Sequence, residues 1–293
     1  MQFDLTTEAG RKALANTIHA DVEAACQEHF AEGFRTHLGA SIIGHECARY
    51  LYNAFRWVHK EKVEGRMYRL WNRGHKEEPR FIQWLRLIGF TVHEFDHEGD
   101  GETQYRIEGA HGHFGGSLDS IAFAPERYGL GETPLLPEYK THAEKYFKVV
   151  KKDGVRKAQP KHFKQMCSYG RAYNIRYGLY CAVNKNTDEL YYEIVELDWS
   201  QADDLFRKAE YIIFSKTPPP KISDTPTYYQ CKMCSLVGVC QLDEPVLKNC
   251  RSCQHSRPIE GKEWWCDLHS PQANAPIPKD VIPNGCPSWV SVI

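Results

Sequence analysis

The chain has 293 residues, of which 42% are hydrophobic and 26% are charged, and its formal net charge is −1. This composition is ordinary for a soluble globular protein, and no apolar run approaches the roughly 20 residues that a membrane span needs. We therefore expect one large domain or two smaller ones and no membrane partner. The N-terminus has neither the basic start nor the apolar core of a secretion signal, so we expect a cytoplasmic location.

Apolar residues at helical spacing predict the first three elements. A helix is predicted over residues 6–35, where Leu14, Ile18 and Val22 recur at that spacing. A break at 36–41 separates it from predicted helices over 44–60 and 66–88. Pro79 is expected to kink the third helix or to mark its early part.

The middle of the chain predicts strands and then further helices. Alternating apolar residues predict strands within 91–108, and two more over 117–123 and 135–141. An amphipathic helix is predicted over 161–179. The apolar pairs and runs at 182–183 and 190–195 flank a turn cluster at 184–188, which predicts a hairpin. A helix over 201–215 ends at the proline run 217–220, and a cysteine-rich tail follows.

Glu138-Tyr139-Lys140 is a pattern that suits metal-assisted cleavage of phosphodiesters. A carboxylate and an amine two residues apart lie on the same side of a strand. With Asp119 upstream, Glu138 offers oxygen ligands to a hard cation such as Mg²⁺, and Lys140 offers positive charge to a phosphate or an attacking water. Each motif taken alone also fits a turn aspartate or an exposed strand face.

Two helical pairs accompany this pattern. His75 and Glu78 are three residues apart and so share a helix face, and Gln165 and Tyr169 lie one helical turn apart. Either pair alone fits a solvated helix surface. The occurrence of all the motifs in the order helix, strand, strand, helix argues against coincidence.

The segment from Lys140 to Lys185 is strongly basic, with twelve Lys and Arg residues against two acids. A polyanionic substrate would need such a surface. A solvated basic face, or a mobile loop around 151–154, fits the same composition. The expected contacts to a DNA backbone are Lys145, Lys148, Lys161, Lys164 and Arg171.

Seven of the eleven cysteines fall between Cys231 and Cys286, which favours metal ligands over disulfides in a reducing compartment. Cys231, Cys234 and Cys240 have the spacing Cys-x2-Cys-x5-Cys, one ligand short of four, and Cys47 is the candidate fourth. Zinc could use the same thiols. Cys47 could instead be a small buried hydrophobe.

A second set of cysteines predicts a small zinc ribbon or knuckle at Cys250, Cys253, Cys266 and Cys286, with His269 as a substitute for Cys286. The tryptophans of this tail are expected to pack around the metal, with stacking on bases as the alternative. They are Trp264, Trp265 and Trp289. The remaining cysteines are interpreted as core residues, and they are Cys26, Cys167 and Cys181.

The ordered motifs resemble the RecB-like branch of the PD-(D/E)XK nuclease superfamily over residues 40–200. They are Gly74-His75-x-x-Glu78, Gly116-x-x-Asp119, Glu138-x-Lys140 and Gln165-x-x-x-Tyr169. The resemblance implies an α/β (α+β), restriction-endonuclease-like fold with a mixed central sheet flanked by helices. It implies Asp119 and Glu138 as ligands of Mg²⁺ or Mn²⁺, with His75 as a further ligand that Glu78 supports. It also implies Lys140 as the catalytic lysine, and Gln165 and Tyr169 as residues of the active-site helix.

The cysteines at 47, 231, 234 and 240 resemble those of iron–sulfur nucleases in the same superfamily, including the AddB nuclease domain and CRISPR-associated RecB-like exonucleases. That likeness implies a 4Fe–4S cluster. The tail is similar to small C-terminal modules on phage-encoded nucleases. The expected organisation is a helical region at 1–60, a nuclease core at 61–216, an iron–sulfur segment at 217–245 and a zinc-ribbon-like tail at 246–293.

The expected function is metal-dependent DNA cleavage, by an exonuclease acting at DNA ends in recombination, repair or phage DNA metabolism. A structure-specific endonuclease and a non-catalytic nucleic-acid-binding protein are the alternatives. DNA is the expected partner, together with recombination or replication proteins. A phage-encoded protein would act in the cytoplasm of its bacterial host. The oligomeric state stays open.

Overall fold

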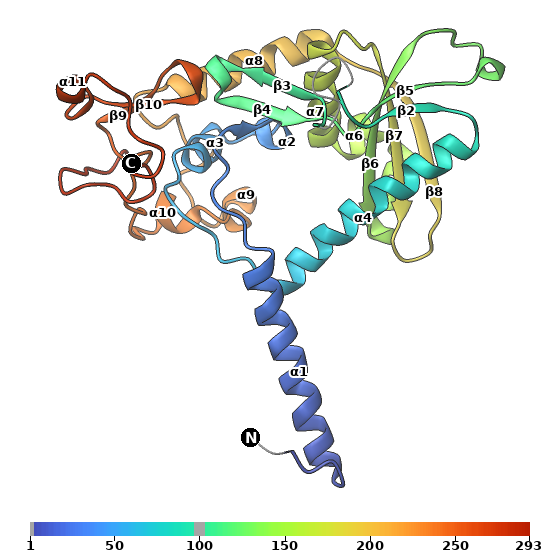
Figure 1. Cartoon of the computed structure of the whole chain (residues 1–293), viewed down its shortest axis with the longest axis horizontal. Helices are drawn as coiled ribbons and strands as arrows, with labels where there is room; N and C mark the ends of the chain where they lie inside the picture. Colours follow the sequence, from blue (N-terminus) through green and yellow to red (C-terminus); the bar gives the residue numbers. More distant parts are fainter. Residues whose placement is uncertain (1–2, 97–102) are drawn as a thin grey trace.

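The computed structural model describes residues 3–96 and 103–293 (Figure 1). Helix α1, Glu8–His29, projects from the rest of the molecule, and none of its residues is buried. Its C-terminal part packs on the start of α4, where Glu23 contacts Arg69 and Gln27 donates to the Val63 carbonyl at 3.0 Å. The predicted helix over 6–35 is therefore correct in kind, but it is too long.

The segment after α1 contains shorter elements than the sequence predicts. Strand β1, Leu38–Gly39, and helix α2, Ala40–Ile43, occupy most of the predicted break. Helix α3 spans only Ala48–Phe55, so the predicted helix over 44–60 is wrong in extent. Its end follows from Trp57, which has a positive φ of 54° and donates from its indole to the Arg35 carbonyl at 2.9 Å. A left-handed residue cannot continue a right-handed helix.

A five-stranded mixed sheet forms the centre of the fold, with strand order β2-β5-β6-β7-β8. Strands β6 and β7 are parallel and the other neighbouring pairs are antiparallel. The strands span Thr91–His93, Ile121–Phe123, Pro134–His142, Tyr177–Asn184 and Leu190–Glu196. The predicted strand over 135–141 and the predicted hairpin are confirmed in β6 and in the β7–β8 pair.

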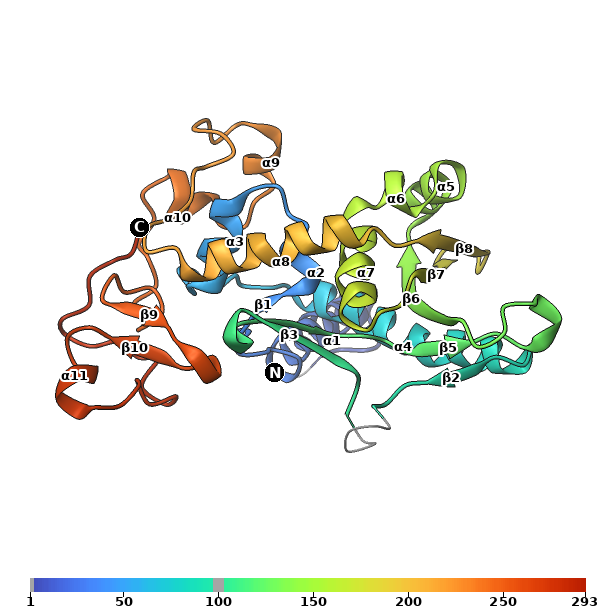
Figure 2. The ribbon, with the colours of Figure 1, turned by 90° about the horizontal axis from the view of Figure 1, so that it is seen from above.

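Helices cover both faces of this sheet. Helix α4, Gly65–Leu87, packs Phe81 and Leu85 against one face and includes Pro79. Helix α7, Pro160–Ala172, packs Phe163 and Met166 against the other. Figure 2 shows α7 between the sheet and α8, Trp199–Phe214. The predicted α/β class, a mixed sheet flanked by helices, is confirmed by this arrangement.

A second sheet has the strand order β1-β4-β3, where β3 is Arg106–Gly109 and β4 is Phe114–Ser117. The prediction of one strand over 117–123 is wrong, because β4 ends at Ser117 and β5 begins at Ile121 in the other sheet. Residues 97–102 of the predicted strand region 91–108 lie outside the described part of the chain. The break at 118–120 carries the chain from one sheet to the other.

The crossover from β6 to β7 is helical. Helices α5, Glu144–Asp153, and α6, Val155–Ala158, precede α7. The loop interpretation of 151–154 is therefore wrong for Lys151, Lys152 and Asp153, which belong to α5. The predicted helix over 161–179 is too long, since α7 ends at Ala172 and Asn174 has a positive φ of 56° before β7 begins. The predicted helix over 201–215 is confirmed in α8.

The C-terminal part consists of short elements that pack at the far end of α8 and α3 (Figure 2). These are α9, Tyr229–Lys232, α10, Val237–Gln241, the antiparallel strands β9, Ser256–Pro258, and β10, Trp264–Cys266, and α11, Ser270–Ala273. In the described part of the chain, 3-10 turns lie at Ala110–Gly112, Glu126–Tyr128 and Glu260–Lys262. Trp264 belongs to the same buried cluster as Phe55. Among the described residues, no helix has both the length and the apolar character needed to cross a membrane.

Candidate active site

Strand β6 presents Glu138 and Lys140 on the face that α7 covers. Alternation along the strand places the two side chains together, and the Lys140 ammonium contacts Oε1 of Glu138. Tyr139 points to the opposite face, where its ring stacks on Phe81 of α4 with centroids 5.5 Å apart. Glu138 is almost fully buried at 1% exposure, whereas Lys140 keeps about a quarter of its side chain exposed at 26%.

Asp119 lies in the break between the two sheets rather than on a strand. The break is held by a bond of 2.9 Å from the Leu118 amide to the Tyr105 carbonyl, and by a contact of 2.9 Å between the hydroxyls of Ser120 and Tyr139. Oδ2 of Asp119 accepts a hydrogen bond from the Tyr139 amide at 3.3 Å. This bond attaches the Asp119 loop to the middle of the Glu138–Lys140 strand.

Helix α4 contributes Glu78 from the edge of the same region. Burial raises the pKa of Glu78, and the charge of Asp119 raises it further. The two carboxylates are therefore close enough to interact electrostatically. His75 is one turn earlier, with Nδ1 3.3 Å from Oε1 of Glu78, and its side chain is 76% exposed. His75 thus reaches the site through Glu78.

Helix α7 closes the site from the other side with Tyr169. The Tyr169 hydroxyl accepts a hydrogen bond from Nε2 of Gln165 at 3.5 Å. It fits because Gly116 has no side chain, since a Cβ there would lie 2.6 Å from the hydroxyl. Burial raises the pKa of Tyr169, and the charges of Glu138 and Asp119 raise it further.

The site has more negative than positive charge. Burial, together with Asp119 and Glu78, raises the pKa of Glu138 to about 7 although Lys140 opposes the shift. Burial acts to lower the pKa of Lys140, but the carboxylates of Glu138 and Asp119 outweigh it and raise that pKa. Three carboxylates around one ammonium leave excess negative charge when all are ionised. A further cation would stabilise the ionised carboxylates.

The possible metal ligands in this cluster are the carboxylate oxygens of Glu78, Asp119 and Glu138. Hard divalent cations such as Mg²⁺ prefer oxygen ligands of this kind. Oε1 of Glu138 is buried and accepts no hydrogen bond of regular geometry from the described residues. In residues 3–96 and 103–293, no three His, Cys, Asp or Glu side chains are arranged so that they could hold a metal ion. Lys140 contacts Oε1, one of the oxygens that a cation would need. The roles predicted for these residues therefore stay predictions.

A cavity of about 490 Å³ opens beside Lys140 and Glu78, and most of its lining residues belong to none of the sequence motifs. Its other polar and aromatic residues include Trp71, His142, Tyr146, His162 and Lys185. Nε2 of His142 and Nδ1 of His162 lie 2.8 and 2.9 Å from the Tyr180 hydroxyl. His142 could have been found from the alternation that puts Lys140 on this face, but His162 comes from α7 and carried no such signal.

The residues predicted to contact a DNA backbone lie on α5 and α7. Lys148 is paired with Glu144 on its own helix, and Arg171 contacts Oδ1 of Asp203 at 2.9 Å. Lys164 packs against Gly44 at the end of α2. Lys145 and Lys161 are exposed on α5 and α7. The predicted surface is thus distributed over two helices rather than over a loop.

The four cysteines of the first set line one cavity. Cys47 caps the N-terminus of α3, and it lines one small cavity with Cys231, Cys234 and Cys240. Three of the sulfurs accept N–H groups, with the Tyr50 amide 3.4 Å from Cys47, the Leu236 amide 3.4 Å from Cys234, and Nε2 of Gln241 3.3 Å from Cys231. The cavity volume of about 20 Å³ has room for roughly one water molecule.

The second cysteine set also converges. A different cavity is lined by Cys250, Cys253, Cys266, Cys286 and His269. Of the other cysteines, Cys167 and Cys181 are buried as predicted, but Cys26 lies on the exposed helix α1 and is only partly covered. The core interpretation is therefore wrong for Cys26.

No protein-family model and no curated protein matches this chain. Solved structures with some likeness include LHK-Exo, an alkaline exonuclease from Laribacter hongkongensis, at 16% identity. Each of its two structures covers 66% of this chain and 90% of its own, with a TM-score of 0.41 for the complex with dAMP and 0.38 for the other. SSO0001 is 15% identical over 78% of this chain and 98% of its own, with a TM-score of 0.43. Likenesses this distant assign no activity to the chain.

Proposed function

We propose that this protein is a metal-dependent DNA nuclease that acts as an exonuclease at DNA ends. The observation that carries the proposal is the convergence of Glu78, Asp119 and Glu138 around the Lys140 ammonium, beside an open cavity. The three carboxylates come from a helix, a loop and a strand that are far apart in sequence. Charge of both signs at one accessible point suits the hydrolysis of a phosphodiester.

Mg²⁺ or Mn²⁺ would be held by Asp119 and Glu138, with His75 as a further ligand that Glu78 orients. The ion would neutralise charge on the phosphoryl oxygens and lower the pKa of a bound water. Lys140 would place its ammonium against the phosphate or the attacking water and stabilise the negative charge that develops there. Tyr169 and Gln165 would supply hydrogen-bond donors from α7.

A DNA strand would bind in the cavity beside Lys140. Lys185 supplies positive charge, while Trp71 and Tyr146 are exposed aromatic residues on which bases could stack. Outside the cavity, the basic residues of α5 and α7 would contact the phosphate backbone. Recombination, repair or phage DNA metabolism, with replication or recombination proteins as partners, is the proposed setting.

We further propose that Cys47, Cys231, Cys234 and Cys240 hold a 4Fe–4S cluster that joins α3 to the segment 217–245. Four thiols that share one cavity, with N–H groups directed at three of the sulfurs, suit such a cluster. The small cavity means that a cluster would push these side chains outward, whereas a zinc ion would need less movement. The role would be structural.

Cleavage of DNA labelled at one end, with Mg²⁺ or Mn²⁺, tests the nuclease proposal. We expect the wild type to degrade linear DNA and to leave covalently closed circles intact. Asp119→Asn should be inactive, because the asparagine side chain carries no negative charge for a metal ion. Its carbonyl oxygen can still accept the hydrogen bond from the Tyr139 amide, so the loop should keep its position. Cutting of closed circles would favour an endonuclease. Binding without cleavage, or undiminished cleavage by Asp119→Asn, would contradict the proposal.

A further inference from the structure

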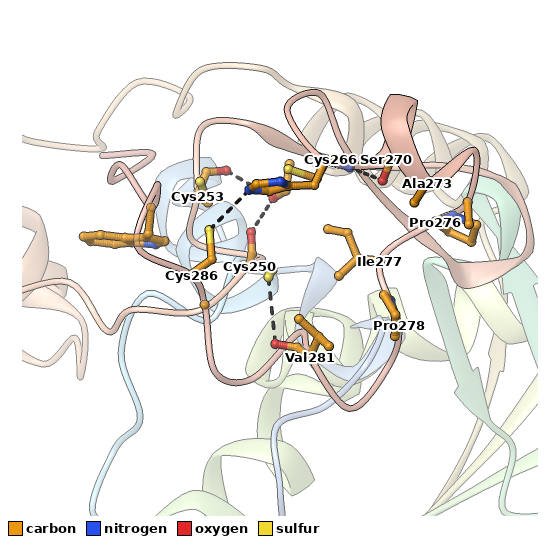
Figure 3. A pocket seen from close by; sticks show the side chains of 15 residues that line it. Cys250, Cys253, Cys266, Ser270, Ala273, Pro276, Ile277, Pro278, Val281 and Cys286 are labelled. Carbon is orange, nitrogen blue, oxygen red and sulfur yellow. Dashed lines mark hydrogen bonds between the residues drawn. The ribbon is translucent and has the colours of Figure 1, made fainter.

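The C-terminal segment, residues 246–293, carries four cysteines that surround one cavity (Figure 3). The cavity has a volume of about 170 Å³. We propose that Cys250, Cys253, Cys266 and Cys286 bind a structural zinc ion, and that this ion fastens the segment to the end of α3. The proposal does not depend on nuclease activity, and it concerns cysteines separate from those around Cys47.

The backbone brings these thiols together from three parts of the segment. Cys250 and Cys253 form a tight turn, in which the Cys253 amide donates to the Cys250 carbonyl at 3.2 Å. Cys266 ends β10, directly opposite Ser256 of β9. Cys286 lies in the last loop, with its sulfur 3.9 Å from Nε2 of His269. A cysteine turn next to a two-stranded ribbon is an arrangement that suits four-coordinate zinc.

The thiols are close but not yet in a coordinating arrangement, because no three metal-binding side chains among the described residues could hold an ion as they stand. Two thiolates of one tetrahedral zinc ion are roughly 3.8 Å apart, so side-chain rotations around the shared cavity would have to bring the four sulfurs to that spacing. Cys250, Cys253, Cys266 and Cys286 nevertheless line one cavity. A cation bound there would neutralise the mutual repulsion of four thiolates.

Two buried arginines beside the cysteine turn provide an independent observation. Arg251 lies between Cys250 and Cys253 in the sequence and is 1% exposed. Its guanidinium carbon is 4.4, 4.2 and 4.6 Å from the ring centroids of Phe55, Trp57 and Trp264. One of its nitrogens donates to the Thr36 carbonyl at 3.0 Å, while Nε and Nη2 have no hydrogen-bond partner in the described part of the chain.

Arg56 approaches the same turn from α3. It is 3% exposed, and it donates to the Cys253 carbonyl at 2.6 Å and to the Ser256 carbonyl at 3.1 Å. Within residues 3–96 and 103–293, neither Arg56 nor Arg251 forms an ion pair with a carboxylate. Two buried guanidinium charges without an anion are costly.

A zinc ion with four thiolates supplies the missing negative charge. The divalent cation and four thiolates together carry two negative charges, which balance the two guanidinium groups. Three thiolates and a neutral histidine would leave one guanidinium uncompensated, so the charge balance favours Cys286 over His269 as the fourth ligand. The charged zinc site would then keep the Arg251 guanidinium between the rings of Phe55, Trp57 and Trp264. Through these contacts it would attach the segment to the end of α3.

Metal analysis of the full-length protein tests the proposal directly. The protein is reconstituted with Zn²⁺ alone, freed of loosely bound metal and measured by elemental mass spectrometry. We expect Cys253→Ser to lose one zinc ion per chain relative to the wild type. Cys26→Ser on α1 is the matched control and should lose none. A wild type that retains no zinc, or a Cys253→Ser variant that retains as much as the wild type, would overturn the proposal.

A second measurement on the wild type covers the case in which Cys253→Ser does not fold. Zinc is removed with a chelator, and the chain is then digested with trypsin before and after Zn²⁺ is restored. We expect cleavage within 246–293 only in the zinc-free protein, and protection again after Zn²⁺ is added. Equal resistance in both states would contradict a structural ion. His269→Ala should keep its zinc whereas Cys286→Ser should lose it, and the reverse result would refute the four-cysteine assignment.

Discussion

Oδ2 of Asp119 accepts a hydrogen bond from the backbone amide of Tyr139, so a loop between two sheets is fastened to the middle of strand β6. The residues on either side of Tyr139 are Glu138 and Lys140, whose side chains lie on the opposite face of the strand from the Tyr139 ring. One backbone amide therefore sets the distance between the Asp119 carboxylate and both charged groups. The candidate site depends on this attachment as much as on the residue types.

Replacing Lys140 by alanine should abolish cleavage while leaving DNA binding largely intact. If the ammonium stabilises charge that develops on the phosphate, its loss should lower the single-turnover rate by about 100-fold or more. In chelator, the variant should also melt at a lower temperature, because the buried Glu138 loses its nearest cation. Added Mg²⁺ should recover part of this loss.

Single-turnover cleavage, fluorescence anisotropy for binding and thermal unfolding check this prediction. Lys12→Ala, an exposed lysine on the projecting helix α1, is the control and should behave like the wild type. A Lys140→Ala variant that cleaves at the control's rate would exclude a catalytic role for the ammonium.

Gly116→Ala should reduce the cleavage rate without unfolding the protein. The new Cβ would lie 2.6 Å from the Tyr169 hydroxyl and 3.0 Å from Cβ of Ala40, so the phenol must move. A displacement of this order near a reacting centre costs about 100-fold in rate. Gly33→Ala is the matched control, since beyond its two chain neighbours no described residue has an atom within 4 Å of the place that a Cβ would take there. Equal rates for the two variants would show that Tyr169 does not need its present place.

The sequence alone predicts which of these residues lie together only where the pattern is local. Alternation along 135–141 is a local property, and it correctly placed Glu138 and Lys140 together. The position of Asp119 depends on tertiary bonds, because the Leu118 amide bonds to the Tyr105 carbonyl just before β3 of the second sheet and Oδ2 of Asp119 accepts the Tyr139 amide of the central sheet. No local pattern contains that information.

The same limit explains the errors in the helices. Helix α3 ends early because the indole of Trp57 bonds to Arg35 and the backbone there is left-handed, which is a tertiary effect. The end of helix α5 also fits a mobile loop around 151–154 by sequence alone, because Lys151 and Lys152 carry no apolar periodicity of their own. The helix forms because Phe147 and Val150, one turn apart, are fully buried.

Tyr146→Ala should weaken binding of single-stranded DNA. The Tyr146 ring is 56% exposed at the cavity beside Lys140, where a base could stack on it. Loss of one stacked base costs about 1–3 kcal/mol, which is roughly a 5-fold to 150-fold rise in Kd. Tyr211→Ala on α8 is the matched control, because Tyr211 is 55% exposed but does not line this cavity. Anisotropy titrations in chelator measure both, and equal Kd values would place the strand elsewhere.

Cys234→Ser should remove the iron from anaerobically purified protein. If Cys234 is one of four cluster ligands, the wild type should be brown, with visible absorption and with iron and sulfide in equal amounts. Cys181→Ser, a buried cysteine on β7 outside both cysteine sets, is the control and should keep its colour. A colourless wild type that contains zinc but no iron would replace the cluster with the zinc alternative.

Protonation of His113 should destabilise the fold at mildly acidic pH. His113 is fully buried, and this burial, with the nearby charge of Arg251, lowers its pKa to about 4. The hydrogen bond between its Nε2 and the Ile259 carbonyl, at 2.8 Å, acts in the opposite direction. Its Nδ1 has no hydrogen-bond partner of regular geometry among the described residues. Between the unfolded pKa of 6.5 and the folded value, the unfolded chain binds more protons, so stability falls as pH falls through this window.

The expected contribution of His113 is a loss of about 2 kcal/mol in unfolding free energy between pH 7 and pH 5. His113→Gln keeps an N–H donor for the Ile259 carbonyl but cannot be protonated, so urea unfolding of this variant should change less with pH than that of the wild type. Burial also lowers the pKa of His45 and His142 to about 4, so part of the dependence will remain. His19→Gln, at an exposed position on α1, should leave the dependence unchanged. Identical pH profiles for His113→Gln and the wild type would mean that His113 accepts a proton in the folded state without cost.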